Sequence, residues 1–194
     1  MVLLLITGNG CDDDQISVYR EPRQKKRAST DYTDQSEAID YRSSMLIDWD
    51  LPAGWRYASY DHPIRQATIL AGDDPVNMLE IAVTSLPGDG GGLLANINRW
   101  RWQIGLEPVS ESNLNDHVQI LPDTVFTIYL VDLTAEQIRL NDHGNEPGRL
   151  LAAVVSTGES TWFVKAVSSI DIIAAHRDAF IEFVRSFRYH GESR

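Results

Sequence analysis

The sequence predicts an α+β fold, an antiparallel β-sheet covered by helices, behind a disordered N-terminal segment. Residues 12–44 are almost all polar and show no apolar periodicity. The residues that follow fall into short runs of β-branched and aromatic side chains separated by turn residues. Two later stretches instead repeat apolar residues at helical spacing. Strands in runs with few helices between them favour an antiparallel sheet over a doubly wound parallel one.

The composition fits one globular domain and argues against several function classes. The chain has 194 residues, of which 43% are hydrophobic and 23% charged, enough for a sizeable core. The 17 lysines and arginines against 28 acids give a formal net charge of -11, so we expect no nucleic-acid partner. The single cysteine excludes an internal disulfide and a zinc cluster built on several thiolates.

That cysteine, Cys11, follows the short apolar run at residues 2–6 and a few small residues. The arrangement resembles the end of a bacterial lipoprotein signal, in which the cysteine is lipidated and becomes the new N-terminus. No basic residue precedes the run, and Gly8 stands where leucine is usual. The resemblance implies that residues 1–11 are the remnant of a signal, and that a lipid anchor holds the protein at a bacterial membrane, facing the periplasm. The alternative is a frayed cytoplasmic N-terminus with an incidental cysteine.

Residues 12–44 are predicted to be a disordered polar linker. They cannot bury enough apolar surface to offset the entropy lost on ordering. A flexible linker of about thirty residues reaches about 30 Å, enough to work beside a membrane. The basic cluster Lys25, Lys26 and Arg27 could contact anionic headgroups, although a solvated patch is the simpler interpretation.

The folded domain is predicted to span residues 45–190 and to begin with four strands. Pro52, Pro63 and the run Asp73, Asp74 and Pro75 separate them, which is the turn chemistry of an antiparallel meander. The strands are expected at residues 45–49, 54–60, 64–71 and 77–85.

Residues 93–104 show helical spacing. Gly105 follows at a position typical of a helix C-terminus. We expect Trp100 in the core and Trp102 partly exposed, because a single apolar stripe is formed by Leu93, Ile97, Trp100 and Ile104.

Strands are expected again after this helix, with turns at Pro122-Asp123 and Gly158-Glu159. Their predicted ranges are residues 118–121, 124–133, 150–156 and 161–167. A final helix over residues 172–187 should bury four apolar side chains, Phe180, Phe183, Val184 and Phe187.

Residues 86–106 combine a glycine-rich turn with the run Asn96-Ile97-Asn98-Arg99-Trp100-Arg101-Trp102-Gln103-Ile104-Gly105-Leu106. This segment resembles a family of uncharacterised, often lipid-anchored envelope proteins of planctomycete-type bacteria. The family's hallmark is a Gly-rich turn followed by Asn-x-Asn-Arg-Trp-Arg-x-Gln-x-Gly-Leu. Trp102 stands where the motif usually has a small or polar residue. The similarity covers roughly residues 49–189, including Leu51-Pro52-Ala53-Gly54-Trp55, Val131-Asp132-Leu133 and Trp162-Phe163-Val164-Lys165.

Proteins of this family look similar in architecture to the PsbP-like fold, an antiparallel sheet sandwiched by helices. The resemblance therefore implies a PsbP-like α/β/α sandwich. It implies no activity and no cofactor. The photosynthetic PsbP-like proteins act as extrinsic assembly or stabilising subunits, which favours a non-enzymatic role.

The glycine-rich turn at residues 88–92 allows two interpretations. Backbone amides at Gly90, Gly91 and Gly92 run into a helix start, where they could bind an anion. The run lacks the Gly-Lys-Ser/Thr ending of a P-loop and the spacing of a dinucleotide fingerprint. A sharp strand-to-helix turn that needs positive φ is the simpler interpretation.

On the helix, polar residues form a second candidate site. Asn96, Arg99 and Gln103 share one face, and with Arg101 they could bind a carboxylate, a phosphate or a glycan. The structural alternative has Arg99 or Arg101 pairing with an acid such as Glu80 or Asp132, while the amides bond loop backbone.

Other catalytic or metal-binding patterns are weak. The five histidines are scattered without metal-ligand spacing, and no Gly-x-Ser-x-Gly elbow is present. Lys165 lies in an alternating strand, and a lysine there is expected on the exposed outer face.

The leading hypothesis is a non-enzymatic envelope lipoprotein, tethered at Cys11, that binds or stabilises an unknown envelope protein or complex. The acidic surface would favour basic or cation-associated partners. The rival is a small-ligand or anion-binding domain, perhaps catalytic, that uses the turn at residues 88–92 with Arg99 and Arg101. A ligand site demands convergent donors, whereas a docking module needs an exposed apolar patch.

Overall fold

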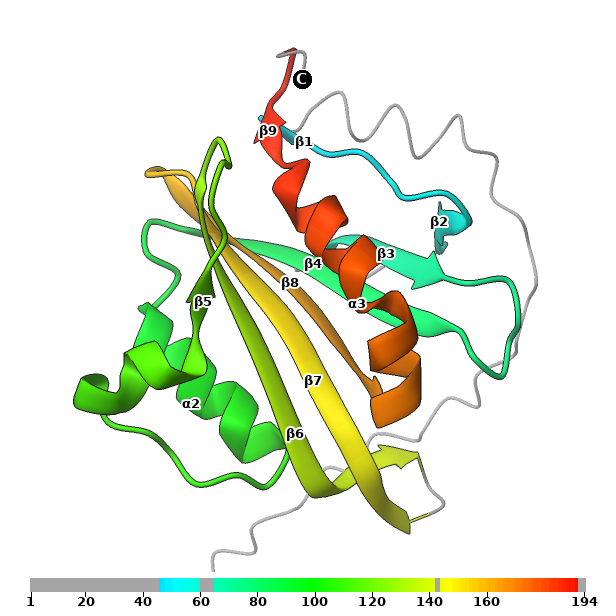
Figure 1. Ribbon diagram of the computed structural model, residues 1–194. Coiled ribbons are helices and arrows are strands. Elements are labelled where there is room, and N and C mark those ends of the chain that lie inside the picture. Colours follow the sequence, from blue (N-terminus) through cyan, green and yellow to red (C-terminus); the bar gives the residue numbers. More distant parts are fainter. Residues whose placement is uncertain (1–45, 60–64, 142–143, 192–194) are drawn as a thin grey trace, which may run out of the picture. The chain divides into compact units, whose positions relative to one another are not determined.

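The computed structural model describes residues 46–59, 65–141 and 144–191. The predictions for Cys11 and for the linker at residues 12–44 lie outside this part of the chain. Within it the protein forms one seven-stranded antiparallel sheet, with a helix on each face (Figure 1). This arrangement confirms the predicted α+β class and its antiparallel sheet covered by helices.

The sheet is built from two meanders, β2-β3-β4 and β5-β6-β7-β8, joined by the connection through α2 (Leu93–Gln103). The last strand of the second meander, β8, pairs with the last strand of the first, β4. The order across the sheet is β2-β3-β4-β8-β7-β6-β5. The strands are β2 (Trp55–Tyr57), β3 (Arg65–Ala71), β4 (Leu79–Pro87), β5 (Gln119–Ile120), β6 (Thr127–Asn141), β7 (Gly144–Ser156) and β8 (Ser160–Ser169).

β6 and β7 are longer than the sequence predicted. The pairing of Ala135 with Gly148 is followed by a register shift before Ile138 pairs with Glu146. Such a bulge breaks the alternation of buried and exposed residues on which a strand prediction depends. The predicted strands therefore ended near residues 133 and 150, where the alternation stops.

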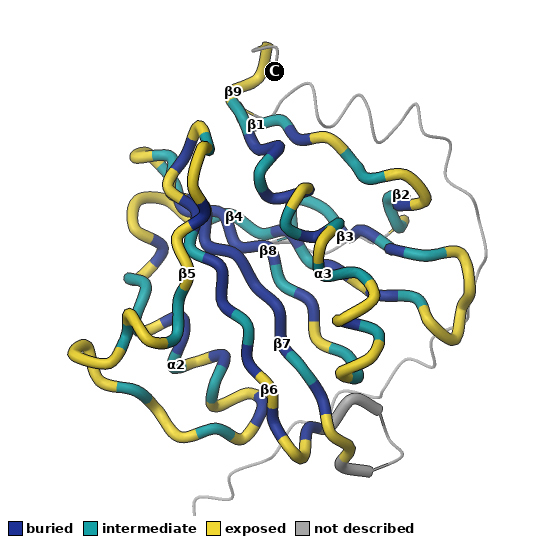
Figure 2. The backbone as a smooth tube through the Cα atoms, in the orientation of Figure 1, coloured by how far each residue is buried: buried dark blue, intermediate teal, exposed yellow. Residues whose placement is uncertain are grey.

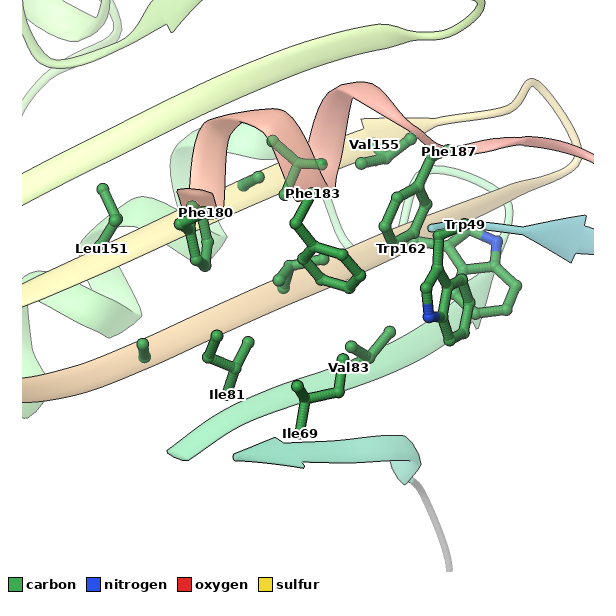
Figure 3. Packing of buried hydrophobic residues seen from close by; sticks show 14 of the residues in the cluster. Trp49, Ile69, Ile81, Val83, Leu151, Val155, Trp162, Phe180, Phe183 and Phe187 are labelled. Atoms are coloured by element: carbon green, nitrogen blue, oxygen red, sulfur yellow. The ribbon is translucent and has the colours of Figure 1, made fainter. Parts of the chain in front are cut away.

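The larger core lies between the sheet and α3 (Ile170–Arg185). Alternate strand residues such as Ile81 and Leu151 point toward Phe180 and Phe183 of the helix (Figure 3). The helix begins two residues earlier than predicted, because the Ser169 hydroxyl accepts a hydrogen bond from the backbone N–H of Ile172. All four apolar side chains predicted to be buried on this helix segment are buried: Phe180, Phe183, Val184 and Phe187.

A smaller core lies on the opposite face, under α2 (Leu93–Gln103). Trp100 is 4% exposed and meets Phe163 of β8 edge to face, with ring centroids 6.1 Å apart. Trp102, two residues later, is 79% exposed. Both tryptophan predictions are therefore confirmed. Figure 2 shows buried backbone along the central strands, with exposed positions on the outer side of each helix.

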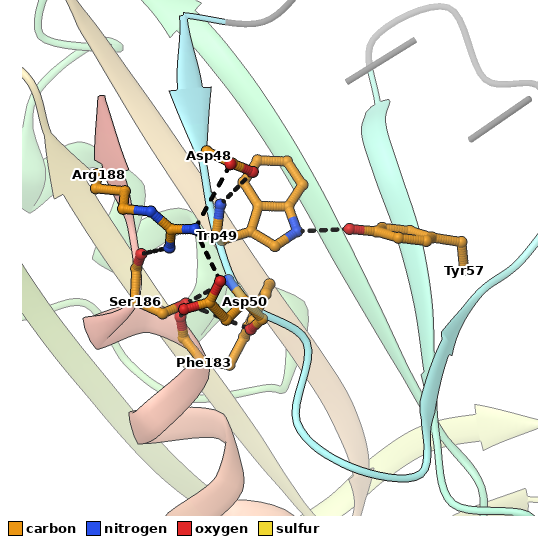
Figure 4. A network of polar contacts seen from close by, with 7 residues as sticks. All are labelled: Asp48, Trp49, Asp50, Tyr57, Phe183, Ser186 and Arg188. Carbon is orange, nitrogen blue, oxygen red and sulfur yellow. Dashed lines mark hydrogen bonds and ion pairs between the residues drawn. The ribbon is translucent and has the colours of Figure 1, made fainter. Parts of the chain in front are cut away.

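The two ends of the described domain are held together by a second, two-stranded sheet. β1 (Ile47–Asp48), which lies within the strand predicted at residues 45–49, does not join the meander and pairs instead with β9 (Arg188–Tyr189), a strand that the sequence did not predict. Two further contacts reinforce this pair (Figure 4). The backbone N–H of Asp50 donates to the Ser186 hydroxyl at 2.9 Å, and Arg188 lies 2.8 Å from the Asp50 carboxylate.

Trp49 packs beneath the two-stranded sheet of β1 and β9. Its ring stacks on Phe187 at 5.1 Å, and its indole N–H donates to the Tyr57 hydroxyl at 3.0 Å. The start of the domain is thereby fixed against the C-terminal end of α3. None of the helices in residues 46–59, 65–141 and 144–191 is long and apolar enough to cross a membrane.

Candidate functional site

In the glycine-rich turn between β4 and α2, the backbone amides donate hydrogen bonds to acceptors within the turn. Gly90 donates to the Pro87 carbonyl at 3.4 Å and Gly92 to the Asp89 carbonyl at 3.1 Å. The N–H of Gly91 donates to the Asp89 carboxylate at 3.0 Å. The three amides that an anion cradle would need are therefore engaged inside the turn, and their φ angles of 61°, 87° and 83° are those of a sharp change of direction.

Gly90 also lies directly against β8. A Cβ at this position would stand 2.6 Å from Cζ of Phe163 and 3.0 Å from Cβ of Thr161. The Thr161 hydroxyl donates to the Gly88 carbonyl at 2.7 Å, which fixes the turn on the strand. Only glycine satisfies both the positive φ and this close contact.

Asn96 joins the turn to the helix. Its buried side-chain amide donates to the Gly90 carbonyl at 3.0 Å and to the Gly92 carbonyl at 2.7 Å. Both amide protons are thus used to hold loop backbone, as the structural alternative for this residue expected. The Gly92 position itself supplies no side-chain cap to α2.

Two other motif residues hold the segment that follows α2. The Asn98 side chain makes two hydrogen bonds with the Val109 backbone, donating at 2.9 Å and accepting at 2.8 Å. The Arg101 guanidinium donates to the Glu107 carbonyl at 2.5 Å. This segment leads into η1 (Glu111–His117), a 3-10 helix that the sequence did not predict.

The expected ion pairs of Arg99 or Arg101 with Glu80 and Asp132 do not form. Glu80 pairs instead with Arg65 on the neighbouring strand at 2.9 Å. Asp132 lies on the other face of the sheet: it is two residues from Leu130 of the core beneath α3, whereas its neighbours Val131 and Leu133 belong to the core beneath α2. The helix α2 covers the opposite face, so its arginines cannot reach Asp132.

Asp132 instead holds α3 on the sheet. Its carboxylate receives Arg149 of β7 at 2.5 Å and Arg177 of α3 at 3.0 Å. Burial disfavours the ionised form of this carboxylate. The hydrogen bonds from the two arginines outweigh that effect and hold the pKa of Asp132 below its usual value.

Of the predicted site residues, only the side chains of Arg99 and Gln103 are not bonded to the backbone of the described residues. Arg99 is exposed, and no other described residue gives it a hydrogen bond or an ion pair. Gln103 accepts a hydrogen bond from the Lys165 ammonium group at 3.0 Å. Lys165 thereby joins Gln103, and Arg99 lies one turn earlier on the same face of α2.

Lys165 is half-buried, whereas the sequence predicted an exposed side chain. Burial lowers its pKa, and repulsion from Arg65 and Arg99 lowers it further. The three cations therefore lie close enough to interact. Strand alternation could have indicated the position of Lys165, because it shares a face with Phe163 two residues earlier.

No group of three or more histidine, cysteine, aspartate or glutamate side chains able to hold a metal ion occurs among the described residues.

Comparison with known proteins finds no matching protein family and no matching curated protein. Similar solved structures include PsbP (CyanoP) from Synechocystis sp. PCC 6803, with a TM-score of 0.47 and 11% identity over 75% of this chain and 87% of that one. LpqN of Mycobacterium tuberculosis, described as involved in cell envelope biogenesis, has a TM-score of 0.42 and 15% identity, over 73% and 81%. A protein from Bacteroides thetaiotaomicron VPI-5482 has a TM-score of 0.46 and 10% identity, and the 77% of this chain that matches spans 47% of that one.

Proposed function

We propose that the protein is a non-enzymatic envelope lipoprotein, tethered at Cys11, whose domain binds or stabilises a partner protein through the outer face of α2. The observation that carries the proposal is Trp102, which is 79% exposed in the middle of the polar motif. Tryptophan and arginine are the residues most enriched at the energetic centres of protein interfaces. Arg99 precedes Trp102 by three positions, so the two side chains are neighbours on the helix surface.

The other faces of α2 already have structural tasks. Its apolar stripe lies in the core, Asn96 holds the preceding turn, and Asn98 and Arg101 hold the following segment. Trp102 has no such task that the described residues reveal. A large aromatic side chain in that position favours a function outside the fold.

The position of the domain's first strand is compatible with a tether. β1 pairs with β9 near the C-terminal end of α3, whereas α2 covers the other face of the sheet (Figure 1). The chain therefore enters the described domain on the face of the sheet opposite α2. The resemblance to lipid-anchored planctomycete-type proteins supports the anchor at Cys11 and remains a hypothesis.

Site-specific photo-crosslinking in the native bacterium tests the docking face. A crosslinker at position 102 should give one defined protein adduct, and a crosslinker at Asp178, on the outer side of α3, should not. Binding of the identified partner should then weaken about thirtyfold in Trp102→Ala, corresponding to ~2 kcal/mol. Identical adducts at both positions, or none at position 102, would contradict the proposal.

The intact mass of the protein extracted from its native membrane tests the tether separately. A mass beginning at Cys11 with added acyl chains supports the lipoprotein assignment. An unmodified protein beginning at Met1 in the soluble fraction contradicts it. A Cys11→Ser variant should leave the membrane fraction while keeping its fold, because the cysteine lies before the domain.

A further inference from the structure

A cluster of hydrogen-bond donors without an acceptor lies beside α2. Lys165 uses one of its three N–H groups on the Gln103 carbonyl oxygen. That bond leaves the Gln103 amide group as a donor, and the Arg99 guanidinium supplies five more N–H donors. The one acceptor among these three side chains, Oε1 of Gln103, already holds the Lys165 ammonium group, and the set presents mainly donors and positive charge to a ligand. Such a set fits an anion.

The strands beside Lys165 supply no counter-charge at the directly opposite positions. Its cross-strand neighbours are Ala82 on β4 and Ala152 on β7. Directly opposite positions in an antiparallel pair are where a neutralising acid would lie, with Cβ atoms about 5 Å apart. Two alanines there leave the ammonium group without an acid on either neighbouring strand.

The positive charge is unusual for this chain and costs stability. Acids outnumber lysines and arginines by 28 to 17, yet Lys165 repels both Arg65 and Arg99. Glu80, the acid of this region, already pairs with Arg65. Burial lowers the pKa of Lys165 and this repulsion lowers it further, and an anion bound between Lys165 and Arg99 would oppose the repulsion. Arrangements that weaken a fold often serve a binding site.

We propose that Arg99, Gln103 and Lys165 form a binding site for an oxyanion, the phosphate or carboxylate group of a ligand. The site goes beyond partner docking at Trp102 and does not depend on it. It also differs from an anion cradle in the glycine-rich turn, because it uses Lys165 of β8 and neither the turn amides nor Arg101.

NMR titration of the full-length protein tests the site directly. Inorganic phosphate and acetate are added separately at constant pH, with sodium chloride at equal ionic strength as the reference. We expect the amide signals of residues 99–103 and of Lys165 to shift with at least one oxyanion and not with chloride. A response to phosphate alone indicates a phosphate-bearing ligand, and a response to acetate alone indicates a carboxylate. No response beyond that of chloride with either oxyanion would overturn the proposal.

Matched variants identify the residues responsible. Lys165→Met and Arg99→Gln should each weaken the oxyanion at least about tenfold, because a hydrogen bond to a charged group is lost. Arg101→Gln is the control on the same helix, and its affinity should change less than twofold, about the limit of such comparisons. Oxyanion binding that persists in Lys165→Met, or that is lost in Arg101→Gln but not in Arg99→Gln, would refute the site.

Gln103→Glu provides a test in the opposite direction. The new carboxylate would lie beside Lys165 and occupy the site from within the chain. We expect the oxyanion response to disappear and the pKa of Lys165 to rise, with the amide spectrum otherwise that of the folded protein. If Gln103→Glu binds phosphate and acetate as the unaltered protein does, the site is not where we place it.

Discussion

Removing one of the two tryptophans of α2 at a time should separate the core face of this helix from its outer face. Trp100→Ala deletes a ring that is 4% exposed and that meets Phe163 edge to face at 6.1 Å. Tryptophan-to-alanine changes in cores cost about 3–5 kcal/mol, of which such an aromatic pair contributes about 1 kcal/mol. For a domain of this size that loss lowers the melting temperature by roughly 10 °C.

Trp102→Ala is the matched control. It makes the same substitution two residues away on a ring that is 79% exposed. Little apolar surface returns to water, and alanine favours the helix by about 0.5 kcal/mol, so the net change should stay within ~0.5 kcal/mol.

Urea unfolding followed by far-ultraviolet circular dichroism measures both variants, since fluorescence would be altered by the loss of a tryptophan. The informative quantity is the difference between the two free energies of unfolding. Equal losses, or a larger loss for Trp102→Ala, would show that α2 packs on the sheet through a different face.

Four further substitutions have outcomes fixed by the structure. Gly90→Ala should cost about 2–4 kcal/mol, because strain at positive φ adds to a Cβ 2.6 Å from Phe163. Gly91→Ala meets nothing within 4 Å and should cost only the ~1 kcal/mol of strain in the same urea assay. Asp132→Asn should cost about 1–3 kcal/mol at neutral pH. Because the folded-state pKa of Asp132 is lowered, that difference should be complete above the ordinary aspartate pKa and vanish as pH falls through the lowered value. Lys165→Met should raise stability by about 0.5–1 kcal/mol at neutral pH, and its advantage should shrink as pH rises from the lowered pKa toward the ordinary lysine value, measured as the melting temperature of both proteins.

The parts of the fold that the sequence predicted well are those where one local pattern decides the outcome. The stripe through Ile97 and Trp100 specifies both the helix and its buried face, since helical periodicity and burial have the same cause. The two-residue strand β9 carries no periodicity and was not predicted. The strand predicted at residues 45–49 contains β1, but its pairing with β9 joins distant ends of the chain and could not be read from a local pattern. The pairing that places β8 between β4 and β7 likewise depends on tertiary packing, which no short window contains.

The candidate site was predictable only in its helical half. Arg99 and Gln103 share a face by spacing alone, so the sequence could place them together. Lys165 lies 62 residues further along the chain from Gln103, and only the pairing of β8 with β4 and β7 places them 3.0 Å apart. For the same reason the sequence could not choose acid partners for Arg99. Which face of the sheet Asp132 occupies depends on the register of β6, and a shift of one residue would have reversed it.

Taken residue by residue, the polar motif divides between the fold and the surface. Asn96, Asn98 and Arg101 each bond to backbone carbonyls of the segments on either side of α2, so they determine how the chain enters and leaves the helix. Arg99 and Trp102 make no such contact with the described residues, yet they lie next to each other on the exposed surface. Substituting the first group should therefore lower stability. Changes at Arg99 and Trp102 should leave stability nearly unchanged and alter binding, which makes the motif separable by experiment.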